Sequence, residues 1–169
     1  MGLKNGNVIL ENDYLNWCKM FNAEKQILED MFGNIATEIE HIGSTSIKGL
    51  SAKPIIDIAV RVNDFNDIEK IKDELELIYT IKNNEESGEI LLIKEKDNIT
   101  YFLIHIRIID SQRYRDVISF RDYLRNNYED LRRYEKLKIE LAEKYKDDRK
   151  MYTQSKKEFI EEILEKIKE

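Results

Sequence analysis

Two neighbouring segments of the chain carry residue types that could bind phosphate and a metal ion. Gly43, Ser44 and Thr45 follow an apolar alternating run, and Asp57 lies inside a second apolar run that starts at Pro54. Backbone N–H groups and hydroxyls at a glycine turn can bind an anion, and a carboxylate on the next strand can hold a divalent cation. This combination predicts a nucleotide-handling site, with Asp57 as ligand of a divalent metal ion.

Asp57 needs a partner because its neighbours along the chain are apolar. An ionised carboxylate among apolar side chains is costly unless it is paired, hydrogen-bonded or bound to a metal. Its apolar neighbours are Ile55, Ile56, Ile58 and Val60. An ion pair that only closes the sheet is the structural alternative to a metal site. The candidate partners for such a pair are Lys53, Arg61 and Arg107.

The turn from Gly43 to Thr45 also has two interpretations. It could hold phosphate groups at the start of a helix, but Ser and Thr are favoured as helix N-caps without any ligand. The connection from Gly43 to Asp57 is short and has an expected strand on each side. We therefore expect the turn and the acid to lie close together, which favours the phosphate site.

A second polar pair lies on a later strand, in the sequence YFLIHIRII. His105 and Arg107 alternate with apolar residues and share one face of this strand with Leu103. A histidine and an arginine there could bind phosphate or transfer a proton, although a histidine in such a place can equally be a hydrogen-bonded core residue. His41, next to the turn, could simply face solvent.

The spacing of apolar residues predicts the elements that carry these side chains. A period of two, or a run of β-branched residues, predicts a strand, and a spacing of three or four predicts a helix. The expected strands are residues 8–10, 39–42, 55–62, 90–93 and 99–109. The expected helices are residues 14–32 after an Asn12 or Asp13 cap, 68–78 after an Asp64 or Asn66 cap, 113–125, 128–145 and 155–168. Residues 83–88 are expected to form a turn, and residues 94–98 a hairpin loop.

This order of elements predicts an α+β fold in which helices flank a mixed sheet and a helical layer follows at the C-terminal end. The length of 169 residues fits a single domain, residues 1–169. The aromatic stripe of the first helix, with Trp17 and Phe21, is expected to pack in the core.

The composition argues against several classes of function. Charged residues make up 37% of the chain, but both signs are mixed and the net charge is -6, which is not the basic face that nucleic acid needs. The single cysteine, Cys18, argues against a disulfide framework and a cysteine metal cluster. The sequence has no apolar run long enough to span a bilayer and no signal-peptide pattern, so the expected compartment is the cytoplasm. The oligomeric state is not predicted.

Several blocks of sequence together resemble the GrpB family. HIGSTSIKGLSAKPIIDIAV closely resembles its signature, in which H-hydrophobic-G-S-T is followed by G-L and by A-K-P-hydrophobic-hydrophobic-D. FLIHIRII is similar to the histidine strand of that family, and FRDYLRNNYEDLRRYEKLKIELAEKY and YTQSKKEFIEEIL are similar to its later helices. The resemblance extends from about Tyr14 to the C-terminus.

The resemblance implies a nucleotidyltransferase fold of the DNA polymerase beta type. In that superfamily a G-S turn holds a nucleoside triphosphate, and acids on the next strand hold magnesium. Gly43, Ser44 and Asp57 match the turn and the first acid, whereas Ala59 stands where a second acid is usual. His105 and Arg107 take the place of a third acid. A further departure is Lys48, where the family commonly has proline.

Two hypotheses about function follow. The first is a nucleotidyltransferase, with Asp57 on magnesium, Lys53 and the Gly43–Thr45 turn on phosphates, and His105 as a possible base. The second is a module that binds a nucleotide or phosphorylated metabolite without transfer, which Ala59 favours. Four residues of the C-terminal helices are expected to line the substrate side, unless they form a solvated face: Arg121, Lys138, Tyr152 and Lys156.

Overall fold

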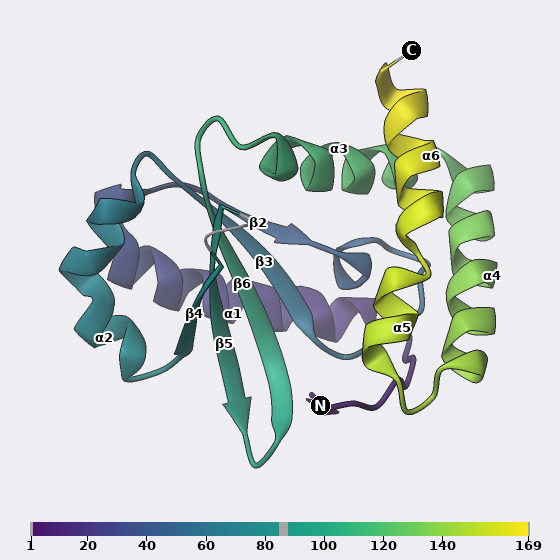
Figure 1. The fold of residues 1–169 in the computed structure, drawn as a ribbon, viewed down its shortest axis with the longest axis horizontal. Coiled ribbons are helices and arrows are strands. Elements are labelled where there is room, and N and C mark those ends of the chain that lie inside the picture. Colours follow the sequence, from purple (N-terminus) through teal and green to yellow (C-terminus); the bar gives the residue numbers. More distant parts are fainter. Residues whose placement is uncertain (1, 85–87, 169) are drawn as a thin grey trace.

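The protein is built on a six-stranded mixed sheet (Figure 1). The computed structural model describes residues 2–84 and 88–168. The strand order is β2-β3-β6-β5-β4, and β1 pairs with the start of β6. Only β3 and β6 run parallel among the described strand pairs. The strands are β1 (Leu3–Lys4), β2 (Ala36–Ile42), β3 (Ile56–Val62), β4 (Thr80–Asn84), β5 (Glu89–Lys96) and β6 (Ile99–Ile108).

Helices cover both faces of this sheet. The α-helices are α1 (Tyr14–Phe32), α2 (Lys72–Glu76), α3 (Gln112–Asn126), α4 (Tyr128–Lys144), α5 (Arg149–Gln154) and α6 (Lys157–Lys168). The described chain also has three 3₁₀ segments: η1 (Gly33–Ile35) between α1 and β2, η2 (Ser44–Ser46) between β2 and β3, and η3 (Phe65–Ile71) between β3 and α2. Figure 1 shows α1 and α2 on the side of the sheet away from α3, and α4 to α6 gathered at one end. None of the described helices is long and apolar enough to cross a membrane.

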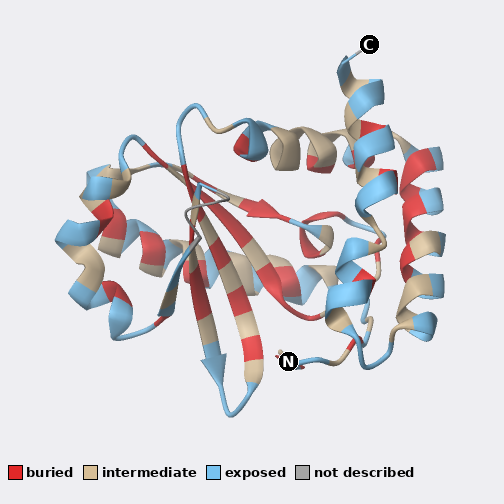
Figure 2. Ribbon diagram, in the orientation of Figure 1, coloured by how far each residue is buried: buried red, intermediate tan, exposed pale blue. Residues whose placement is uncertain are grey.

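The main core lies between α1 and the sheet. Trp17 and Leu28 of α1 pack there with Ile58 of β3 and Ile104 of β6, and all four side chains are fully buried. A second, smaller cluster joins α3, α4 and α6 to the segment around Ile47. Buried positions alternate with half-buried ones along most of β6 (Figure 2), and the half-buried residues face the other side of the sheet.

The predicted α+β class, mixed sheet and helical C-terminal layer are confirmed, with local corrections. The strand predicted at residues 8–10 is wrong, because this segment runs past the α4–α5 connection, where the Val8 N–H donates to the Lys146 carbonyl. The strand is instead β1, which pairs with β6. The helix expected after Asp64 is mostly 3₁₀, although Asp64 does cap it by accepting from the Asn66 N–H at 2.9 Å.

Two short elements differ from the prediction. The turn expected at residues 83–88 begins inside β4, which pairs with β5, and residues 85–87 lie outside the described part of the chain. The last helix is expected to begin at residue 155, but the structure has α5 before it and starts α6 at Lys157.

Candidate functional site

Asp57 lies at the second position of β3, and its side chain points away from α1 into a cavity. Its carboxylate approaches Gly43 so closely that a β-carbon at this glycine would lie 2.8 Å from Asp57 Oδ2. Gly43 also has a φ of 69°, which only glycine adopts at little cost. The predicted proximity of turn and acid is therefore present in the fold.

His105 connects Asp57 to a second carboxylate. Its Nε2 lies 3.4 Å from Asp57 Oδ1, and its Nδ1 lies 3.2 Å from Glu89 Oε1. Burial acts to lower the pKa of His105, but hydrogen bonds to both carboxylates outweigh it and raise the pKa to about 9. At neutral pH the ring is an imidazolium, which donates to both acids and cannot accept a proton.

Glu89 is itself held between two cations. Burial acts to raise its pKa, but His105 and the Arg107 guanidinium, which donates to Glu89 Oε2, lower that pKa to about 2. Glu89, His105, Arg107 and Asp57 thus form a group of two anions and two cations.

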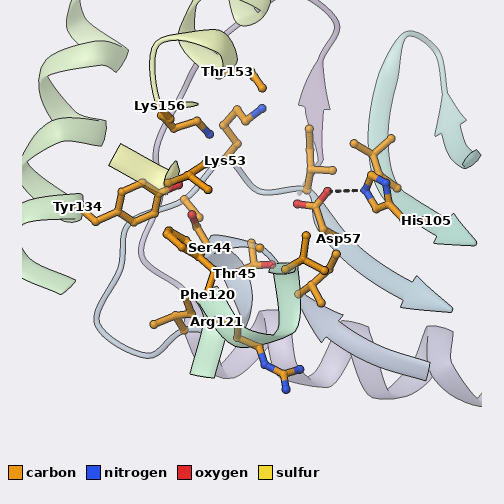
Figure 3. A pocket seen from close by; sticks show the side chains of 18 of the residues that line it. Ser44, Thr45, Lys53, Asp57, His105, Phe120, Arg121, Tyr134, Thr153 and Lys156 are labelled. Carbon is orange, nitrogen blue, oxygen red and sulfur yellow. Dashed lines mark hydrogen bonds and ion pairs between the residues drawn. The ribbon is translucent and has the colours of Figure 1, made fainter. Parts of the chain in front are cut away.

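Three cationic side chains, which we call the basic wall, border the cavity near Asp57: Lys53, Arg149 and Lys156. The ammonium groups of Lys53 and Lys156 lie 5.5 Å and 4.5 Å from the centroid of the buried Tyr152 ring. Burial, with repulsion from Lys156 and Arg149, lowers the pKa of Lys53 to about 7, and burial lowers that of Lys156 to about 8. Figure 3 shows both lysines below Thr153, with Asp57 and its bond to His105 in the same cavity.

Arg149 completes the basic wall from the first residue of α5. Burial lowers its pKa, and its buried Nη2 atom has no hydrogen-bond partner among the described residues. An unpaired guanidinium nitrogen at a cavity is a donor for a ligand, because buried polar atoms are nearly always bonded.

The Ser/Thr turn is a single 3₁₀ turn, η2, and not the start of an α-helix. The Ser46 hydroxyl donates to the Gly43 carbonyl at 2.6 Å, and Thr45 Oγ1 lies 3.0 Å from His41 Nε2. Ser44 faces Tyr134, to which it is hydrogen-bonded. The hydroxyls of Thr45 and Ser46 are therefore used by the fold.

His41 does not face solvent as the sequence allowed. It is buried and stacks on Phe21 with ring centroids 4.7 Å apart. Burial lowers its pKa to about 4, so the ring is neutral. His41 is a structural partner of the turn.

The cavity has a volume of about 520 Å³, a size typical of small-molecule sites. Its lining combines polar and apolar side chains. Asp57, His105 and the basic wall are at one part, and apolar side chains of α3, α4 and α6 form much of the rest. These apolar residues are Val117, Phe120, Tyr134, Ile160 and Leu164.

Comparison with known proteins identifies the family. The model of the GrpB protein family matches residues 7–166. The chain belongs to the GrpB family. It is 38% identical to the glutamate-rich protein GrpB of Alkalihalophilus pseudofirmus over 99% of both chains. It is also 33% identical to a UPF0157 protein of Halalkalibacterium halodurans, over 89% of this chain and 77% of that protein.

A solved structure agrees with this assignment. The crystal structure of conserved protein GrpB from Enterococcus faecalis superposes with a TM-score of 0.86 at 30% identity, covering 94% of this chain and 96% of that one. A cytoplasmic RNA terminal U-transferase gives a TM-score of 0.44 at 16% identity over 69% of this chain, a likeness too weak to bear on activity. The resemblance to the GrpB family is thus confirmed.

The GrpB fold brings together most of the residues that the sequence singled out. Those that line the cavity are Gly43, Ser44, Thr45, Lys53, Asp57, His105, Arg107, Arg121, Tyr152 and Lys156. Arg121 borders the cavity, but its charge is neutralised by Glu40 at 2.6 Å and Asp122 at 2.7 Å. In Figure 3 its guanidinium points away from Asp57 and Lys53.

Lys138 is outside the residues that line the cavity, contrary to the predicted phosphate contact. Its fully buried ammonium donates to the Ser51 carbonyl and pairs with Glu135 at 3.2 Å. Glu135 in turn accepts from the Ser51 N–H at 2.9 Å. Lys138 therefore fixes the segment that leads to Lys53 onto α4, which is a structural role.

Among the described residues, Asp57 forms none of the sheet-closing ion pairs that the sequence suggested. It pairs with His105, whereas Arg61 pairs with Glu38 at 2.5 Å and Arg107 with Glu89. The carboxylate remains partly exposed to the cavity, with 32% of its side chain accessible.

The donors around Asp57 do not fit the Mg²⁺ that the resemblance implies. Ala59, at the position of the second acid, is fully buried against Ile42 and Tyr114. No group of three or more His, Cys, Asp and Glu residues in the described ranges could hold a metal ion. One carboxylate beside an imidazolium and a basic wall is a poor environment for a divalent cation.

Sequence analysis missed Glu89 and Arg149. Glu89 precedes the predicted strand 90–93, and the register that pairs Ile90 with Ile106 continues to place it beside Arg107. Extending that hairpin by one residue could have found it. Arg149 lies in the six-residue α5, whose sequence RKMYTQ gives no periodic signal.

Proposed function

We propose that this GrpB family protein binds a nucleotide or another phosphorylated small molecule in the cavity beside Asp57. The observation that carries the proposal is the basic wall, where Lys53, Arg149 and Lys156 meet at one part of a cavity of about 520 Å³. Phosphate oxygens accept charge-assisted hydrogen bonds from ammonium and guanidinium groups. An anion would also relieve the mutual repulsion of these cations.

The rest of the cavity suits the organic part of such a ligand. Ligand sites are mostly apolar, with a few polar groups that fix orientation. Phe120 and Tyr134 lie edge to face with ring centroids 5.4 Å apart, and both line the cavity. Aromatic edges and faces of this kind can contact a base or another flat group.

Binding without nucleotidyl transfer is the form of the function that the site supports best. Transfer would need a base and metal-held phosphates. His105 is already protonated at neutral pH, since its pKa is about 9, and Ala59 offers no second carboxylate. If a nucleoside triphosphate bound and pyrophosphate appeared with an acceptor alcohol, transfer would replace simple binding.

Thermal unfolding tests the proposal with a panel of inorganic phosphate, pyrophosphate, nucleoside mono- and triphosphates and sugar phosphates. A panel member present at a hundred times its Kd should raise Tm by about 5–10 °C. Lys156→Met should remove this rise. The exposed Lys136 of α4 makes the matched control, because Lys136→Met deletes the same charge away from the cavity. If no member raises Tm at millimolar concentration, the proposal is wrong.

A further inference from the structure

The charges around the cavity do not balance. Arg107 is neutralised by Glu89, and Arg121 by Glu40 and Asp122. What remains along the cavity lining is the basic wall and the imidazolium of His105, set against the two carboxylates of Asp57 and Asp116. The electrostatic field at this place therefore favours an anion over a cation.

We infer that the cavity binds its phosphorylated ligand without a divalent cation, with Lys53, Arg149 and Lys156 supplying the positive charge that Mg²⁺ would otherwise supply. The inference rests on the proposed function and specifies how that site neutralises its ligand. In metal-dependent phosphate sites the ion bridges phosphate oxygens and a carboxylate. Here the side chains can contact the phosphate directly.

Asp57 is poorly placed to hold a metal against this field. Its Oδ1 atom faces the His105 ring at 3.4 Å, and its Oδ2 atom lies against Gly43. A bound Mg²⁺ would share the cavity with the three cationic side chains of the basic wall. Repulsion between like charges in a partly desolvated cavity is stronger than in bulk water, so the metal would lose affinity.

The two lysines are arranged as phosphate ligands. Both ammonium groups lie over the ring of Tyr152, which is 1% exposed. Lys53 comes from the segment before β3, and Lys156 from the connection between α5 and α6. Two neighbouring ammonium groups on separate segments repel each other, and a shared anion would offset that repulsion. Arg149 adds a buried Nη2 atom without a partner among the described residues.

Asp57 has opposite roles in metal-bridged binding and in direct binding by the basic wall, so its substitution tells the two apart. If a metal bridges ligand and protein, Asp57 is essential and Asp57→Asn abolishes binding. If the basic wall binds the phosphate directly, Asp57 repels the anion. Asp57→Asn should then leave affinity unchanged or raise it, by up to about tenfold.

Titration calorimetry on the full chain measures this directly. Pyrophosphate and adenosine mono- and triphosphate are the probes, each titrated in EDTA and again in excess Mg²⁺. In EDTA the wild type should bind at least one probe, Asp57→Asn should bind it as well or better, and Lys53→Met or Lys156→Met should bind it about ten- to a hundredfold more weakly. Lys156→Arg should retain most of the affinity, and Lys136→Met should be unchanged.

The results separate the inference from the proposed function. Binding that appears only with Mg²⁺ and vanishes in Asp57→Asn would overturn metal independence but leave the phosphate site standing. Absence of binding for every probe, with and without Mg²⁺, would overturn both. Circular dichroism and Tm of each variant establish that a loss of affinity is not a loss of fold.

Discussion

Lys53 and Lys156 are the residues whose chemistry is most altered by the fold. With pKa values of about 7 and about 8, each ammonium group is easier to deprotonate than a free lysine. A bound phosphate would stabilise the charged forms and raise both pKa values. Ligand binding near pH 8 should therefore be accompanied by proton uptake.

The cost of charging Lys53 predicts how its removal changes stability with pH. The pKa of Lys53 is about 7 in the folded state, whereas a lysine exposed to water has a pKa of 10.5, so the unfolded chain binds more protons between these values. The stability penalty is full below pH 7 and disappears as pH rises toward 10.5. We expect Lys53→Met without ligand to be more stable than wild type by about 1–3 kcal/mol at about pH 6, and this difference to vanish near pH 10.

Urea unfolding at several pH values measures this difference. Lys136→Met, at an exposed position, should show no such dependence on pH. A Lys53→Met variant that is less stable than wild type at about pH 6 and equally so at about pH 10 would contradict the prediction, because it would show a packing effect and not a charge effect.

The element that decides the site geometry is the turn between β2 and β3. Gly43 ends β2 in a conformation with positive φ, and its missing side chain leaves room for the Asp57 carboxylate. The hydroxyls of Thr45 and Ser46 bond inside the turn. The turn thus sets how closely the Asp57 carboxylate on β3 approaches the backbone at Gly43.

Gly43→Ala tests this role against a matched glycine. Gly6 also has positive φ, at 91°, but no described residue lies within 4 Å of the position that a β-carbon would take there. Gly6→Ala should cost about 1 kcal/mol from backbone strain alone. Gly43→Ala should cost about 2–4 kcal/mol, because its methyl group also meets Asp57. Equal losses of unfolding free energy in urea would show that the close approach is unimportant.

Elements with a strong periodic pattern could be predicted from the sequence. The aromatic stripe along α1 and the alternation of apolar and polar residues along β6 identify which residues face the core. The alternation along β6 also places His105 and Arg107 together on the cavity face. β4 was missed because TIKNN has only one apolar residue, and its partner β5 determines it instead. Such edge strands depend on pairing more than on their own sequence.

The basic wall could be predicted only in part. Lys53 and Lys156 are candidates as separate residues, but their meeting over Tyr152 depends on how α6 docks onto the sheet. Lys138 shows the converse, since a lysine on the same helical layer binds the Ser51 carbonyl instead. Side-chain direction across layers follows from packing, which a single sequence does not specify.

At the scale of the whole molecule, the cavity lies where two layers meet: the sheet and the layer of C-terminal helices. The sheet, with its own core against α1, contributes Asp57 and His105, and the helical layer contributes Arg149, Tyr152 and Lys156. A ligand that contacts both sides would hold the layers together. We expect its effect to extend beyond the residues that it touches.

Hydrogen exchange with and without a bound phosphate compound measures this coupling. Amide protection should increase in η2 and β3 and at the same time in α5 and α6, because opening of either layer would release the ligand. Lys156→Met should show neither increase. Protection confined to one layer would contradict a site shared between them.

The distribution of the cavity wall along the chain has a consequence for biosynthesis. Asp57 and His105 leave the ribosome well before Arg149 and Lys156, so a nascent chain can form its sheet while the basic wall is still being made. Its half-built pocket holds Lys53 and Asp57 but lacks Arg149 and Lys156. The proposed ligand would therefore engage only molecules whose helical layer has been synthesised and docked.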